Sequence, residues 1–144
     1  MHDIGHLGML WAFPEYEKAM IEASANGQNL LTAERELFGL DHAEAGRWLL
    51  SQWGCPIELQ NTAAFHHNPP LKPDCDRELI RLVSACSQAA DLMGMSVFPP
   101  ASPVDLADAA SSLPPDARRE LVEGYPGIAE WVFLTVNEIE LKLL

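Results

Sequence analysis

Residues 41–53 read DHAEAGRWLLSQW and have the spacing of an amphipathic helix. The apolar residues of this stretch fall on one helical stripe: Ala45, Trp48, Leu49 and Trp53. Asp41 is a natural N-cap, and Glu44, one turn later, completes an acidic variant of the capping box. Gly54 follows the last apolar residue, and the proline shortly after it can open another helix. We therefore predict one helix here and a second over residues 56–67.

The same periodicity continues on both sides of this stretch and is interrupted by proline and glycine. It predicts further helices over residues 2–13, 14–25, 32–39, 76–94, 104–111, 115–123 and 127–143. Gly124, Tyr125 and Pro126 read as the turn between the last two helices, because glycine ends helices and proline opens them. No sustained alternation of apolar and polar residues competes as a strand. The sequence therefore predicts an all-α bundle.

Helical spacing also predicts which side chains form the core. The expected buried side of the helix over 76–94 carries Leu79, Leu82, Val83, Cys86, Ala90 and Met93. The four tryptophans lie at helical spacings and are expected in the core: Trp11, Trp48, Trp53 and Trp131. Gly5 and Gly8 stand inside the first helix, where glycine costs about 1 kcal/mol relative to alanine. Close packing of a neighbouring helix would justify these two glycines.

The composition fits a single globular domain over residues 1–144. Its 21 acidic and 9 basic side chains give a formal net charge of -12. This balance argues against nucleic acid and an anionic membrane surface as partners, since both are bound through basic residues. Three cysteines without a CxxC spacing suit a reducing compartment. No signal peptide or membrane span is recognisable, so we expect a cytoplasmic protein.

Residues that could hold a metal concentrate in the first half of the chain. His2-Asp3 is an adjacent nitrogen and oxygen donor pair, and His66-His67 is a second adjacent pair. Asp91 stands in an otherwise apolar run, where a carboxylate is costly unless it is paired or binds a metal. We expect six residues to converge in one cleft: His2, Asp3, His42, His66, His67 and Asp91. Imidazole and carboxylate without thiolate suit iron, manganese, zinc or magnesium.

Several segments resemble the HDOD branch of the HD superfamily of metal-dependent phosphohydrolases. They are HDIGHL at 2–7, FPEY at 13–16, FGLDHAEAGRWLLSQWGCP at 38–56, AAFHHNPP at 63–70 and a helix ending in AAD at 89–91. The resemblance covers residues 2–94 in order. It implies an HD-like helical bundle with its core in 1–94 and additional C-terminal helices in 95–144.

The resemblance also implies roles for the candidate residues. His2, Asp3 and Asp91 correspond to metal-holding and catalytic positions of the superfamily. His42, His66 and His67 correspond to positions that hold a second metal or contact the substrate. HDOD domains usually act as signalling modules that bind protein partners. The alternative is a phosphohydrolase acting on a phosphomonoester, nucleotide or cyclic nucleotide, and a weaker one is a structural fragment whose metal residues are relics.

Two departures from the superfamily pattern bear on activity. The superfamily's first ligand histidine comes from a helix before the HD pair, whereas this sequence starts one residue before it. We therefore expect a bundle truncated at its N-terminus, with slow hydrolysis or none. In the related HD-GYP class the Gly-Tyr-Pro motif closely follows the two histidines. Here it lies far beyond His67, in the predicted turn at 124–126.

Overall fold

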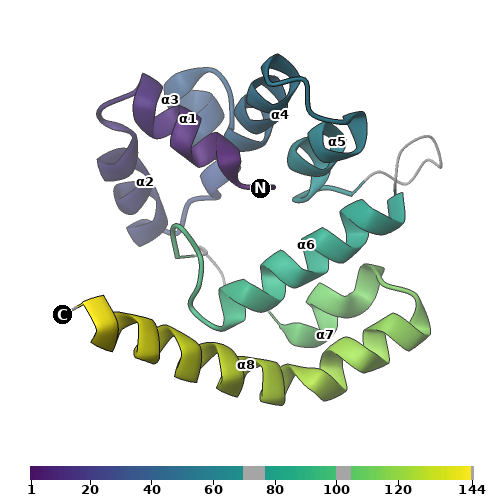
Figure 1. Cartoon of the computed structure of the whole chain (residues 1–144). Helices are drawn as coiled ribbons and strands as arrows, with labels where there is room; N and C mark the ends of the chain where they lie inside the picture. Colours follow the sequence, from purple (N-terminus) through teal and green to yellow (C-terminus); the bar gives the residue numbers. More distant parts are fainter. Residues whose placement is uncertain (70–76, 100–104, 144) are drawn as a thin grey trace.

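The computed structural model describes residues 1–69, 77–99 and 105–143, with side chains described through residue 136 (Figure 1). Every regular element in these ranges is a helix, as predicted. The elements are α1 (Ile4–Ala12), α2 (Tyr16–Ala25), α3 (Leu30–Phe38), α4 (His42–Gln52), α5 (Ile57–Phe65), α6 (Arg77–Leu92), α7 (Leu106–Ala109), the 3-10 helix η1 (Ala110–Ser112) and α8 (Pro115–Leu143). The predicted starts at residues 76 and 104 lie outside the described residues.

Local signals place the ends of α4 where the sequence predicts them. The Asp41 carboxylate accepts a hydrogen bond from the backbone N–H of Glu44, and the Glu44 carboxylate accepts one from the backbone N–H of Asp41. After the helix, Gly54 adopts a positive φ of 65°, and the N–H of Cys55 donates to the carbonyl of Leu50. This is the left-handed ending that glycine favours. The capping box and the glycine stop are both confirmed.

Helix α4 is the centre of the part of the molecule that carries the candidate site. It packs most extensively against α1 on one side and α5 on the other, and α6 runs below them (Figure 1). The cluster of buried apolar residues has members from α1, α2, α3, α4 and the segment after α6: Met9, Tyr16, Met20, Ala23, Ala33, Ala45 and Phe98. This packing fixes the start of α1 against the start of α4.

The contact between α1 and α4 depends on Gly5. A Cβ atom at Gly5 would lie 1.8 Å from the carbonyl oxygen of His42 and 2.7 Å from the backbone nitrogen of Gly46. At Gly8 an added Cβ would meet only the side chain of Leu49, at 2.8 Å. The expectation that close helix packing explains these glycines is confirmed. The approach at Gly5 brings the residues around it directly beside His42.

The predicted turn at residues 124–126 is wrong, because α8 continues through Pro126. A proline removes one backbone donor and crowds the preceding turn, at a cost of about 3 kcal/mol. The residues around it lie at the surface, where the helix can bend, and Figure 1 shows α8 curved along its length. A bend in one long helix therefore replaces the expected break between two short ones.

The predicted core positions of the tryptophans and of α6 are also wrong. All four tryptophans are exposed: Trp11 by 90%, Trp48 by 61%, Trp53 by 60% and Trp131 by 67%. In α6 the buried residues are Ile80, Ser84, Ala85 and Ala89, whereas Leu82 and Cys86 are exposed. Periodicity shows which residues share a face, but not which face a neighbour covers. Helices α7 and η1 pack against α6, and its exposed face borders a cavity.

Among the described helices, none is long and apolar enough to cross a membrane.

Candidate metal centre

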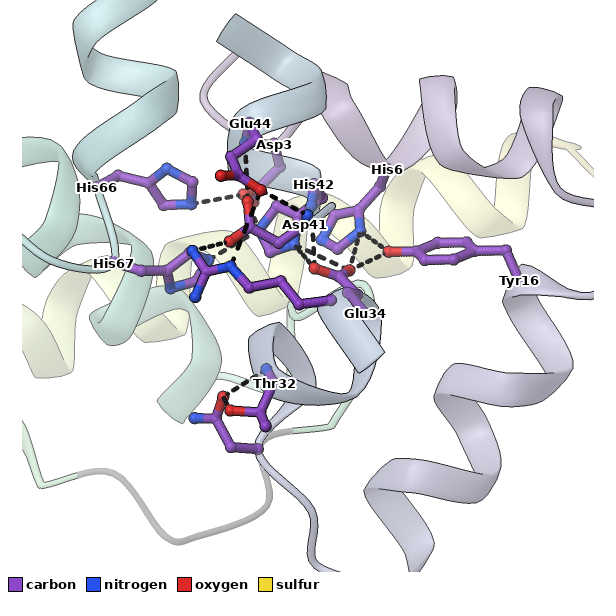
Figure 2. Close-up of polar contacts among 12 residues, drawn as sticks. Asp3, His6, Tyr16, Thr32, Glu34, Asp41, His42, Glu44, His66 and His67 are labelled. Atoms are coloured by element: carbon purple, nitrogen blue, oxygen red, sulfur yellow. Dashed lines mark hydrogen bonds and ion pairs between the residues drawn. The ribbon is translucent and has the colours of Figure 1, made fainter. Parts of the chain in front are cut away.

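Four of the six candidate residues meet at the ends of three helices. Asp3 precedes α1, His42 opens α4, and His66 and His67 follow α5. One ligand atom from each lies within 4.8 Å of the others, and Figure 2 shows the four side chains turned toward one another. The packing of α4 between α1 and α5 thus gathers donors that are distant in sequence.

One ring nitrogen of His66 faces this cluster and lies against the carboxylate of Asp3. Its Nδ1 lies 2.9 Å from the carbonyl oxygen of Ala63, to which it donates, because a carbonyl can only accept. Its Nε2 is buried, accepts no hydrogen bond from the described residues, and lies 3.0 Å from Oδ1 of Asp3. A ring nitrogen and a carboxylate oxygen approach this closely only with a cation between them, either a proton on the imidazole or a metal ion.

His42 is oriented in the same way by a buried carboxylate. Its Nδ1 lies 2.8 Å from Oε2 of Glu34, whose side chain is fully buried, and its backbone N–H donates to the same oxygen at 2.9 Å. The hydroxyl of Tyr16 also donates to Glu34. Nε2 of His42 thereby faces the cluster and shares a hydrogen bond of 2.9 Å with Nε2 of His67. A carboxylate behind a ligand histidine is a common arrangement in metal sites.

The electrostatics favour the protonation states that bind a metal. Burial opposes ionisation of Asp3, but hydrogen bonds from His2 and His66 outweigh it and hold the pKa of Asp3 well below its usual range. Burial, followed by the charges of His66 and His42, lowers the pKa of His67 to about 3. At neutral pH the cluster therefore offers a carboxylate and a neutral imidazole, the forms that ligate metals.

The two remaining candidates lie beside the cluster rather than within it. His2 Nε2 is 2.8 Å from Oδ2 of Asp3, and the ring of His2 meets that of His66 edge to face. Asp91 accepts a hydrogen bond from Oγ of Ser96 at 2.8 Å. Burial raises the pKa of Asp91 despite this hydrogen bond, and the charge of Asp3 adds to the rise. His2 and Asp91 line the same cavity as Asp3.

Sequence reasoning missed three residues that support the cluster. His6 stacks on His42 with ring centroids 3.9 Å apart, and its Nδ1 lies 2.6 Å from the hydroxyl of Tyr16. Burial, followed by the charge of His42, lowers the pKa of His6 to about 4. The spacing of His2 and His6, one helical turn apart, could have indicated His6. Tyr16 lies in the FPEY segment that carries the resemblance, whereas nothing in the local sequence marks Glu34 as buried.

The donor set fits a divalent metal ion. It combines three imidazoles with one carboxylate, contains no thiolate, and leaves a cavity of about 750 Å³ on one side. Such sets suit iron, manganese and zinc, with solvent or a ligand completing the coordination shell.

Comparisons with known proteins show what the part of the chain that carries the cluster is similar to. Residues 1–69 match the family model described as HDOD domain. An uncharacterized protein of Treponema pallidum (strain Nichols) is 30% identical over 86 residues, which cover 58% of this chain and 17% of that protein. No solved structure matches. Residues 1–69, which contain the whole four-residue cluster, are therefore similar to HDOD domains.

Proposed function

We propose that this chain is a signal-transduction module of HDOD type that binds a divalent metal through Asp3, His42, His66 and His67. The observation that carries the proposal is the convergence of four ligand atoms from the ends of three helices, with His42 oriented by the buried Glu34. When bound, the metal supplies positive charge between Nε2 of His66 and Oδ1 of Asp3, which lie 3.0 Å apart. The HDOD match supports signalling as the role of the module.

A protein partner is the expected recipient of the signal. Trp11 on α1 and Trp48 on α4 are exposed by 90% and 61%, on the two helices next to Asp3 and His42. Large exposed apolar side chains are enriched where proteins bind one another. The excess of acidic over basic residues argues against nucleic acid as a partner, since proteins bind nucleic acid through basic side chains.

Metal binding is tested on the full chain by isothermal titration calorimetry with manganese, zinc and, without oxygen, ferrous iron. The expected result is saturable binding that weakens by about tenfold or more in Asp3→Asn, the typical scale of metal-site lesions. Asp116→Asn is the matched control, because Asp116 lies on the exposed start of α8. Absence of binding by the wild-type chain, or unchanged affinity in Asp3→Asn, would overturn the proposal.

The second candidate function is a metal-dependent phosphohydrolase. It is favoured by one observation, that the cavity of about 750 Å³ opens onto the cluster and gives a substrate access to it. A bound metal would polarise a phosphate and lower the pKa of water. One observation argues against high activity: Asp91 accepts a hydrogen bond from Ser96 and is not part of the four-residue cluster.

Phosphohydrolase activity is tested by loading the protein with manganese, iron or zinc and assaying a generic phosphodiester and a cyclic dinucleotide. We expect slow turnover or none. Robust metal-dependent turnover that Asp91→Ala abolishes and Asp108→Ala, at an exposed position of α7, preserves would refute the non-catalytic module and establish the hydrolase.

A further inference from the structure

Helix α8 is long and only sparsely covered by the rest of the chain. Its main packing partner among the described elements is η1, the short helix that directly precedes it. Through residue 136, where the described side chains of α8 end, none of them is fully buried. Figure 1 shows α8 as the outermost element, at the edge of the molecule opposite α4. Most of the stability of a helix in a protein comes from tertiary packing, so α8 gains little from its own chain.

Three apolar side chains form an exposed stripe on this helix. Trp131 is exposed by 67%, and Ile128 and Leu134, three residues before and after it, are exposed by 46% and 59%. Residues three apart are neighbours on a helix surface, so Trp131 has one aliphatic side chain on either side along this stripe. Glu130 is the only charged residue in 125–136, and it lies about 100° around the helix from Trp131. The α8 stripe of Ile128, Trp131 and Leu134 is therefore uncharged.

The spacing makes the α8 stripe complementary to itself. In a contact with two-fold symmetry, a residue pair between two copies occurs twice, with the roles of the copies exchanged. Two α8 helices that cross antiparallel at Trp131 would place Ile128 of each copy against Leu134 of the other. The two Trp131 side chains would meet at the centre, and Glu130 would lie beside the crossing. A second copy of the chain thus offers the apolar surface that the stripe lacks.

The area of the α8 stripe corresponds to a weak interface. A covered aromatic side chain buries about 150–250 Å², so the exposed parts of the three side chains offer on the order of 350 Å² in each copy. With the surrounding helix surface, a dimer would bury on the order of 1,000 Å² in total, the lower limit of specific interfaces. The formal charge of -12 on each copy opposes association, although salt screens it beyond about 8 Å at physiological ionic strength. We therefore expect a weak dimer that added salt strengthens.

We propose that two copies of this chain associate through α8, antiparallel, with Ile128, Trp131 and Leu134 of each copy at the centre of the contact. Two observations favour a second copy over a different protein. The α8 stripe carries no charge by which a partner of opposite charge would be selected, and its residues are spaced symmetrically about Trp131. The contact does not involve the metal site and is independent of the proposed function.

The test is sedimentation equilibrium of the full chain over a concentration series in the micromolar range. We expect a reversible equilibrium between monomer and dimer that shifts toward the dimer as salt is added. Trp131→Glu should raise the dissociation constant by about 30-fold or more, because a central aromatic residue typically dominates an interface. Phe133→Glu is the matched control: Phe133 is exposed by 62% on the same helix but points about 160° away from Trp131, so the dissociation constant should not change.

A charge pair tests the orientation of the two helices. Ile128→Glu and Leu134→Lys should each weaken the dimer, because each places an unpaired charge in an apolar contact. The double variant should restore association, because an antiparallel crossing brings the opposite charges of the two copies together twice. In a parallel pair the like charges would meet, and the double variant would stay monomeric. All of these positions are exposed, and circular dichroism checks that the variants keep their helical content.

Four results would overturn the proposal. They are a wild-type chain that stays monomeric, equal association of Trp131→Glu and Phe133→Glu, a double variant that does not regain association, and assembly beyond the dimer. The last result would show a contact that does not close on itself. A concentration-dependent dimer that Trp131→Glu disrupts and the charge pair restores would support it.

Discussion

Replacing Gly5 by alanine should force α1 away from α4. The new Cβ would lie 1.8 Å from the carbonyl oxygen of His42, whereas ordinary contacts begin at 3.4 Å, so the helices must separate by about 1.6 Å (3.4 minus 1.8). Both neighbouring atoms, in His42 and Gly46, belong to the backbone of α4 and cannot rotate aside. A clash with backbone atoms this close lies at the upper end of the cost of overpacking, about 3 kcal/mol or more. The better helix propensity of alanine offsets about 1 kcal/mol of this cost. The expected net loss of stability is therefore about 2 kcal/mol or more.

The assay is urea denaturation followed by circular dichroism of the helical signal. Gly8→Ala is the matched control, because its Cβ meets only the end of the Leu49 side chain, which can rotate away. We expect the free energy of unfolding of Gly8→Ala to stay within about 1 kcal/mol of the wild-type value. Because the displacement acts at His42, metal affinity should fall in Gly5→Ala and persist in Gly8→Ala. A Gly5→Ala protein as stable as the wild type would refute the close approach of the two helices.

Three further changes test the surroundings of the site. Glu34→Gln removes the charged acceptor behind His42 and should lower metal affinity by about 10- to 100-fold in calorimetry. The control Glu36→Gln, at an exposed position, should leave metal affinity unchanged. Asp41→Ala removes the cap of α4 and should lower the free energy of unfolding by about 0.5–2 kcal/mol in urea titrations; a neutral result would contradict the capping role. Trp11→Ala should change the free energy of unfolding by less than about 0.5 kcal/mol, whereas Leu50→Ala, at a fully buried position, should lower it by about 2–5 kcal/mol. Equal losses in the two variants would contradict the exposed position of Trp11.

Helix positions were predictable because their signals are local. The cap at Asp41 and the positive φ at Gly54 act within one turn of chain, and both appear where the sequence indicates them. Pro126 is equally local as a signal, but its effect depends on whether the surrounding helix can bend, which the sequence does not show. The exposure of Trp11 and Trp131 likewise depends on which elements pack against α1 and α8.

The candidate site was predictable to the extent that its residues stand in adjacent pairs. His66 and His67 follow one another, and the carboxylate of Asp3 follows an imidazole, so a short motif marks them. Glu34 offers no such signal, since charged residues surround it in sequence and only the tertiary fold buries it against His42. The residues that orient a ligand are therefore harder to predict than the ligands themselves.

The distribution of the cluster over three helices has a consequence for the dynamics of the fold. An ion held by both Asp3 and His67 would act as a cross-link that closes the chain between them. In the chain-entropy model, a covalent link that closes a loop of this length raises the free energy of unfolding by about 4 kcal/mol, because it restricts the unfolded chain. The amide hydrogens of α1, α4 and α5 should then exchange with solvent more slowly when metal is bound, while those of α8 remain unaffected. Occupancy of the site would thus set how often α1 opens, and a partner bound along that helix could sense the ion without touching it.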